Sequence, residues 1–171
     1  DLHSFPTRRS SDLEPVKSSG TATNPISIRN NTFRGGGPSS SGGGIMTGDY
    51  GGSYIIVENN ALVDPGQYGI AIAGGSNITI INNRIYGKQQ PFTNNPLYVW
   101  GQLGIACSNI NVTGNRANWT DKNGYNNRGW NAGNCASTLF EYAASITLEE
   151  MSVPAHLITK ITPAELLEIR K

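Results

Sequence analysis

Four basic or aromatic side chains occupy equivalent or neighbouring positions of a segment that the sequence repeats. They are Arg84, Tyr86, Lys88 and Arg116. If the repeats stack as strands, equivalent positions lie ~4.8 Å apart on one outer face. We predict that these side chains form a basic, partly aromatic strip that binds a linear chain of sugars. The alternative is that solvated arginine and lysine side chains simply decorate an outer face.

Two aromatic residues, Tyr98 and Trp100, alternate with apolar residues and are therefore expected to point outward from one strand. The equivalent residues of the preceding repeat, Ala71 and Ala73, are small enough to leave a shelf beneath them. Aromatic faces beside fixed polar groups bind sugar rings through apolar contact below and hydrogen bonds at the rim. We predict that this shelf extends the binding surface; alternatively, the two rings pack under loops.

Acidic residues that could act in catalysis are few. Those within the repeats are Asp49, Glu58 and Asp64. The two aspartates lie in different predicted turns, where Asp side chains commonly bond to the backbone. The sequence shows neither three clustered carboxylates for calcium nor a convincing Asp pair for glycoside hydrolysis. We therefore assign no catalytic residue and no metal site.

The two cysteines, Cys107 and Cys135, bracket a Trp- and Asn-rich segment that we interpret as an ordered loop over residues 119–134. A disulfide would pin this loop, would add ~3–4 kcal/mol in the chain-entropy model, and would imply an oxidising compartment. The alternative is two free thiols. With His156 as the one histidine beyond residue 13, the cysteines do not provide a zinc site.

A twelve-residue phrase, repeated four times, positions these residues. The copies are residues 24–35, 53–64, 76–87 and 108–119. Their third and fifth residues are Ile or Val between polar neighbours, which predicts a strand with one apolar face. The eighth residue is always asparagine: Asn31, Asn60, Asn83 and Asn115. Asparagine tolerates the left-handed conformation of a tight corner, and stacked amides form a ladder from coil to coil.

A further short apolar strand precedes each copy after the first. These strands are predicted at residues 44–48, 69–73 and 96–100. Three strands per repeat predict an all-β protein, a parallel β-helix that forms a solenoid of about four coils. Solenoids of α-helices are excluded, because Gly- and Asn-rich segments without apolar residues at helical spacing are poor helix formers.

With these repeats, residues 24–119 resemble the right-handed parallel β-helix repeat proteins of the pectate-lyase-like superfamily. The resemblance implies a right-handed coil. It also implies lyases with a Lys or Arg base, often beside Ca²⁺, or hydrolases with clustered Asp residues. Neither motif matches this sequence, so no catalytic residue carries over, and Ca²⁺ is suggested by the resemblance alone. The same coil also serves phage tailspikes and adhesins.

The two ends of the chain differ from the repeats. Residues 1–13 resemble a translated sequencing adapter, and we exclude them as an artefact, so we expect an N-terminally truncated protein. Residues 14–23 are interpreted as a linker or a frayed coil edge, and residues 24–135 as the β-helix. Residues 136–171 are predicted to form a C-terminal cap. Its short helix begins at the capping box of residues 162–165, and partner docking is the alternative role for this helix.

Composition limits the possible functions. Charged residues make up 15% of the chain and the net charge is +1, with no basic runs, which argues against nucleic-acid binding. No stretch approaches the ~18 apolar residues of a membrane span. We predict a fragment of a secreted or cell-surface bacterial protein that engages polysaccharide. It is either an enzyme, such as a lyase of acidic glycans, or a non-catalytic adhesin, glycan-binding or structural solenoid; a trimeric tailspike fragment is a third hypothesis.

Overall fold

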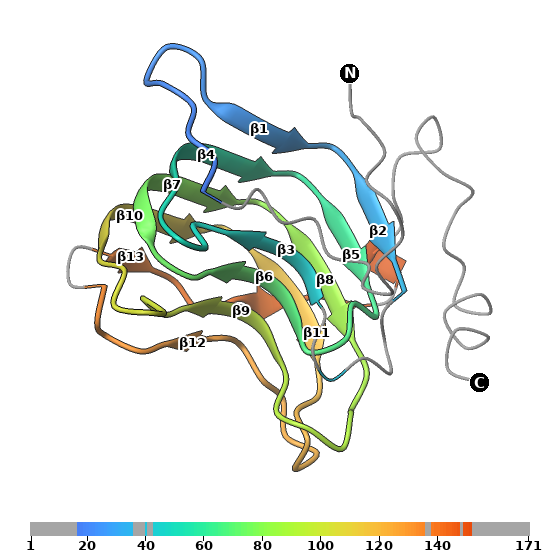
Figure 1. Ribbon diagram of the computed structural model, residues 1–171. Helices are drawn as coiled ribbons and strands as arrows, with labels where there is room; N and C mark the ends of the chain where they lie inside the picture. Colours follow the sequence, from blue (N-terminus) through green and yellow to red (C-terminus); the bar gives the residue numbers. More distant parts are fainter. Residues whose placement is uncertain (1–16, 36–39, 41–42, 136–137, 148, 152–171) are drawn as a thin grey trace.

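The computed structural model describes residues 17–35, 40, 43–135, 138–147 and 149–151. These residues form a solenoid of about four coils, whose strands stack from coil to coil into three sheets (Figure 1). The predicted all-β parallel β-helix is confirmed. None of the described residues belongs to a helix that is long and apolar enough to cross a membrane.

Each sheet takes one strand from successive coils. The first sheet contains β1 (Ile26–Arg29), β4 (Ser53–Glu58), β7 (Gly75–Ile81), β10 (Cys107–Thr113) and β13 (Thr138–Phe140). The second contains β2 (Thr32–Arg34), β5 (Ala61–Val63), β8 (Arg84–Gly87), β11 (Arg116–Trp119) and β14 (Ala144–Ser145). The third contains β3 (Gly43–Thr47), β6 (Tyr68–Ile72), β9 (Asn95–Val99) and β12 (Trp130–Asn131). Every pairing between these strands is parallel.

The apolar residues of the repeated phrase point into the solenoid and stack on their equivalents. In the first sheet, Ile28 lies in register with Val57, which lies in register with Ile80. Val112 continues this column in the next coil, and each member of the column is at most 8% exposed. Burying a β-branched side chain of this size contributes ~1.5–3 kcal/mol before the conformational entropy is subtracted. The coils therefore stabilise one another, because none could bury these side chains alone.

A ladder of asparagine amides fixes the corner between the first and second sheets. The Asn31 Nδ2 donates to Oδ1 of Asn60 at 3.1 Å, Asn60 to Asn83 at 3.0 Å, and Asn83 to Asn115 at 2.9 Å. Each accepting Oδ1 also takes the backbone N–H of the asparagine before it. The predicted ladder is confirmed. It satisfies buried polar groups that would otherwise destabilise the fold.

The left-handed residue at this corner is the one before each ladder asparagine. The φ values are 57°, 55°, 56° and 64° at Asn30, Asn59, Asn82 and Gly114, respectively. The expectation that the eighth residue itself turns the corner is therefore wrong. The seventh residue takes the left-handed conformation, which asparagine and glycine tolerate, and this directs the amide of the eighth residue to the ladder.

The solenoid continues beyond residue 135, the boundary that we predicted. β13 pairs with β10 and β14 pairs with β11, which adds the start of a fifth coil. A single 3₁₀ turn, η1 (Glu149–Met151), follows and contacts β8. The described part of residues 136–171 thus contains two strands and a 3₁₀ turn, and the helix expected at residues 162–171 lies outside the described residues. These strands carry no copy of the repeated phrase, so the sequence did not indicate them.

The described part of the segment predicted as a linker or frayed edge, residues 17–23, lies partly along the second coil. The backbone N–H of Lys17 donates to the Asp49 carbonyl, and that of Gly20 to the Ser53 carbonyl, each at 2.9 Å. Ser19 also forms an isolated parallel bridge with Ser53. These contacts give the start of the described chain a fixed place beside the first sheet.

Candidate functional site

A column of side chains in register crosses the third sheet. Its members are Met46 in β3, Ala71 in β6, Tyr98 in β9 and Trp130 in β12. Strand alternation places them on the opposite face from the buried residues at the next positions, such as Val99. The pairing of Tyr98 with Ala71 confirms the predicted position of Tyr98 above this small residue.

Four aromatic rings surround a depression on this face, which we call the aromatic hollow. They belong to Tyr68, Tyr98, Trp100 and Trp130. Ring centroids lie 5.5 Å apart for Tyr68 and Tyr98, 6.4 Å for Tyr98 and Trp130, and 5.8 Å for Trp100 and Trp130. The corresponding planes are inclined by 85°, 51° and 58°, so the rings form the walls of a concave surface. The volume of about 350 Å³ suits a small ligand or a short stretch of a longer one.

Neutral polar side chains complete the lining of the hollow. They are Gln67, Thr93, Asn95 and Gln102. The Gln102 Nε2 donates to the Tyr98 hydroxyl at 3.1 Å, and the Asn127 Nδ2 donates to Oδ1 of Asn95 at 2.6 Å. These hydrogen bonds orient two of the amides. The described residues that line the hollow include no Asp, Glu, Lys, Arg or His.

Two of the four rings are open to solvent. Trp100 and Trp130 are each 44% exposed, whereas Tyr68 is only 3% exposed. The Tyr68 ring packs directly over Gly43, where an added Cβ would lie 2.3 Å from the ring. This close approach requires glycine. Tyr68 therefore supports the other rings, and the two indoles present broad apolar faces of the kind that mark an interaction surface.

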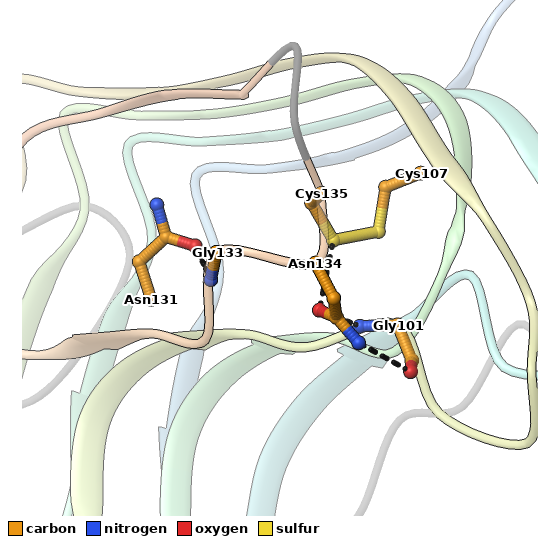
Figure 2. The surroundings of a disulfide bond; sticks show 6 residues. All are labelled: Gly101, Cys107, Asn131, Gly133, Asn134 and Cys135. Atoms are coloured by element: carbon orange, nitrogen blue, oxygen red, sulfur yellow. Dashed lines mark hydrogen bonds between the residues drawn. A yellow bond between two sulfur atoms is a disulfide. The ribbon is translucent and has the colours of Figure 1, made fainter.

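A disulfide and two hydrogen bonds hold the segment that follows β12 (Figure 2). Cys107, at the start of β10, is bonded to Cys135, which confirms the predicted disulfide. The Asn134 Nδ2 donates to the Gly101 carbonyl at 2.9 Å, and its Oδ1 accepts the Gly101 N–H at 3.0 Å. Gly101 directly follows Trp100, so these contacts join the two segments that carry the exposed indoles.

Arg84 and Arg116 are neighbours in the second sheet, as expected, but residues near the C-terminus contact both of them. Arg116 donates from Nε and Nη2 to the Ser145 carbonyl at 3.1 and 2.9 Å. Its Nη1 also forms an ion pair with the Glu150 carboxylate at 2.7 Å. Arg84 donates to the backbone carbonyl of Glu150 at 3.2 Å. Two arginines predicted to face a ligand thus attach the last part of the described chain.

The electrostatics of this pair follow from the same contacts. The hydrogen bond from Arg116, followed by the one from the Thr147 backbone, lowers the pKa of Glu150 from 4.5 to about 2. Burial, followed by the charge of Arg116, lowers the pKa of the Arg84 guanidinium. Glu150 is therefore ionised at neutral pH and lies against the cationic side chain of Arg116.

The other two members of the predicted basic strip do not extend this pair into an open surface. Tyr86 is only 3% exposed, and Val63, its register partner in β5, is fully buried. Alternation with the buried Ile85 leaves Tyr86 on the outer face, but the ring is covered there, so it is not the exposed surface that the strip requires. Lys88 forms an ion pair with the Asp64 carboxylate at 3.3 Å. The strip is therefore interrupted, and a ligand role for its members stays a prediction.

Two of the three acidic residues of the repeats form ion pairs, and the three do not gather. Glu58 lies 3.0 Å from the Arg29 guanidinium, and Asp64 is paired with Lys88. In the part of the chain that the structure describes, no three His, Cys, Asp or Glu side chains lie together as metal ligands. Those residues therefore provide no cluster of carboxylates for the Ca²⁺ that the family resemblance implied.

Trp130, which supplies an outer wall of the hollow, was not among the residues predicted from the sequence. Residues 119–134 lack apolar periodicity, and our interpretation of this whole segment as a loop is wrong at β12, a strand of two residues. One signal could have identified it. Trp130 follows Tyr98 by 32 residues, and Asn115 follows Asn83 by the same 32 residues along the ladder. Tyr68 and the amides of the rim were also missed, because they lie at strand ends and in loops.

The three parallel sheets, the stacked apolar columns and the amide ladder define a parallel β-solenoid with an aromatic hollow on one outer face. The chain belongs to the right-handed β-helix family: residues 16–135 match the family model described as right handed beta helix region. Searches of curated proteins and of solved structures found no match.

Proposed function

We propose that the aromatic hollow binds uncharged carbohydrate and that the chain acts, secreted or at the cell surface, as a glycan-binding solenoid. The observation that carries this proposal is the pair of inclined, half-exposed indoles of Trp100 and Trp130 beside oriented neutral amides. Sugar rings pack their C–H faces on indoles and pair their hydroxyl groups with amides. The disulfide supports an oxidising compartment.

Charge favours a neutral sugar over an acidic one. A uronate carboxylate placed in the hollow would lose hydrating water without gaining a cationic partner, because none of the described lining residues is basic. The two arginines of the predicted strip, Arg84 and Arg116, belong to a different sheet and contact Ser145 and Glu150. The lining therefore fits a hexose or pentose chain without carboxylates.

Cleavage of an acidic glycan by a lyase, as the family resemblance implies, is the alternative function. Such a reaction needs a base beside the bound uronate and a cation that faces its carboxylate. The ionisable groups among the described lining residues are the phenols of Tyr68 and Tyr98, and the Tyr98 hydroxyl accepts a hydrogen bond from Gln102. Binding without cleavage is therefore the function that this site supports best.

The test is isothermal titration calorimetry with matched neutral and uronate oligosaccharides. We expect the neutral series to bind, and we expect Trp100→Ala and Trp130→Ala each to raise Kd about tenfold or more, which corresponds to ~1.4 kcal/mol. Tyr125→Ala is the matched control, because this tyrosine is 71% exposed and is not among the lining residues. It should leave Kd unchanged.

Two results would overturn the proposal. One is neutral binding that is equally strong in both tryptophan variants. The other is selective uronate binding that disappears on Arg84→Ala and is accompanied by the ultraviolet absorbance of an unsaturated product. The second result would establish the lyase alternative and place its site on the second sheet.

A further inference from the structure

We infer that the Cys107–Cys135 disulfide, together with Asn134, is a positioning element of the aromatic hollow that makes its affinity for carbohydrate depend on the redox state of the protein. The inference rests on the proposed function. It is carried, however, by a separate observation, which is the set of contacts that hold β12 against the solenoid.

Few contacts of its own hold β12. The strand has two residues and pairs on one side with β9, where Trp130 lies opposite Tyr98 and Asn131 opposite Val99. It is the last strand of the third sheet, so within the described residues no strand covers its other edge. The Ala132 N–H donates to the Val99 carbonyl at 3.0 Å. The net contribution of a single hydrogen bond of this kind to stability is small, and short edge segments open locally.

The disulfide adds a covalent attachment after β12, whereas hydrogen bonds of Asn127 and Arg128 hold the chain before it. Cys107 belongs to β10, which lies between β7 and β13 in the first sheet, and both sulfur-bearing residues are at most 9% exposed. Figure 2 shows Asn134, beside Cys135, turned toward Gly101. The bond therefore ties the end of the β12 segment to a central strand, and Asn134 ties it to the residue after Trp100. Together they set the spacing of the two exposed indoles.

Loss of this bond should act locally. The amide ladder from Asn31 to Asn115 lies at the corner between the first and second sheets, and its hydrogen bonds involve neither cysteine. The buried columns of the inner coils, such as Ile55 and Ile78, are likewise held by their own strand pairs. We therefore expect a reduced protein that keeps its inner coils but no longer fixes Trp130 beside Trp100.

The redox step needs a reductant from outside the protein. A dithiol reagent attacks one sulfur, the S–S bond breaks, and the reagent closes to its own cyclic disulfide. The protein takes up two electrons and two protons and is left with two cysteine thiols. Reoxidation restores the bond by the reverse exchange with an oxidised dithiol.

The test is a double-mutant cycle between the disulfide and Trp130. Kd for a neutral oligosaccharide is measured for the wild-type protein and for Trp130→Ala, each oxidised and reduced, with circular dichroism to verify the solenoid. We expect reduction to raise Kd about tenfold in the wild type and less than about twofold in Trp130→Ala. Cys135→Ser should reproduce the effect of reduction without a reagent, and Asn134→Ala should show a smaller change in the same direction.

An equal rise of Kd in both proteins would overturn the inference, because it would mean that reduction damages the hollow generally. An unchanged Kd in the reduced wild type would overturn it as well. Failure of the oxidised wild type to bind any neutral glycan would instead refute the proposed function.

A readout without ligand keeps the inference testable in that case. In Trp100→Phe protein the remaining tryptophans are the exposed Trp130 and the buried Trp119. Reduction should increase acrylamide quenching of the fluorescence of this protein. It should leave the quenching of the Trp100→Phe/Trp130→Phe protein unchanged, and equal quenching before and after reduction of the first variant would refute the positioning role.

Discussion

The aromatic hollow and the Arg84–Arg116 pair lie on different sheets of the same solenoid, and they differ in how far the rest of the chain contacts them. The two arginines are contacted by Ser145 and Glu150, which follow in the start of a fifth coil. The two indoles of the hollow remain 44% exposed each. Backbone carbonyls and a carboxylate of the same chain accept hydrogen bonds from the two arginines, whereas the apolar faces of the indoles stay open to an external molecule.

This difference shows which kind of surface residue indicates a ligand. An exposed arginine is stable in water and finds hydrogen-bond acceptors in its own chain, so its presence on a face is weak evidence of function. An exposed indole gains little from water. Two of them, inclined around one depression with oriented amides at its rim, are therefore the stronger evidence.

The largest predicted effect comes from the amide ladder, which stabilises the stack of coils that carries both surfaces. Asn83→Ala deletes a buried amide that donates to the Val57 carbonyl and to Asn115, and that accepts from Asn60. Because several buried groups lose their partners, we expect the free energy of unfolding to fall by about 3–5 kcal/mol in denaturant titrations. Asn31→Ala, at the exposed end of the ladder, is the control and should cost about 1 kcal/mol. Equal costs would show that burial does not set the strength of the ladder.

A smaller effect should be confined to the hollow. Gly43→Ala places a Cβ within 2.3 Å of the Tyr68 ring, so the ring must move and disturb its edge-to-face contact with Tyr98. We expect Kd for a neutral oligosaccharide to rise about fivefold, or ~1 kcal/mol, in calorimetry. Ser27→Ala, at an exposed position of the first sheet, should leave Kd unchanged. An unaltered Kd for Gly43→Ala would mean that Tyr68 does not support the other rings.

Removing the two arginines should show that the hollow binds carbohydrate independently of the basic pair. In Arg84→Ala/Arg116→Ala protein, neutral-glycan affinity should stay within about twofold of the wild type, since neither arginine lines the hollow. The free energy of unfolding should fall only slightly, because the hydrogen bonds to the Ser145 carbonyl and the exposed ion pair with Glu150 are lost. A tenfold loss of affinity in this variant would contradict the separation and restore the basic strip as a binding surface.

The smallest effect concerns pH. The pKa of Glu150 is lowered to about 2 in the folded protein, so its interaction with Arg116 stabilises the fold above the ordinary pKa of 4.5. This stabilisation is lost as the pH falls from 4.5 through about 2. Titration of the Glu150 carboxyl carbon by nuclear magnetic resonance should show the low midpoint, and Arg116→Gln should return it toward 4.5. A wild-type midpoint near 4.5 would show that the ion pair does not persist in solution.

The features that recur in every coil could be predicted from the sequence. Alternation identified inward columns such as Ile28 and Val57, and the invariant eighth residue identified the ladder. Alignment of the short apolar strands that precede the phrase also placed Tyr98 over Ala71. These features depend on local spacing, which stacking preserves from coil to coil.

Features built by segments without the phrase could not be predicted in this way. Trp130 lies in a strand of two residues, too short to show a period, and Ser145 and Glu150 reach the arginines from a coil that has no repeat signature. The burial of Tyr86 follows from its surroundings in three dimensions, because alternation alone places it on an outer face. The role of a repeated position therefore depends on the residues that contact it, and those residues lie outside the repeated phrase.

The amide ladder has one more consequence, for how solenoids of this kind change length. Successive ladder asparagines are 29, 23 and 32 residues apart, yet their bonds run in the same direction with nearly the same geometry. Asn31, Asn60 and Asn83 each donate to the next ladder asparagine along the chain. The ladder therefore makes one such bond between each pair of adjacent coils, whatever the number of residues between them. Loops can lengthen or shorten without shifting the register, and a whole coil that carries its own asparagine can be gained or lost as a unit. The corner thus preserves the alignment of the stack while the loops diverge.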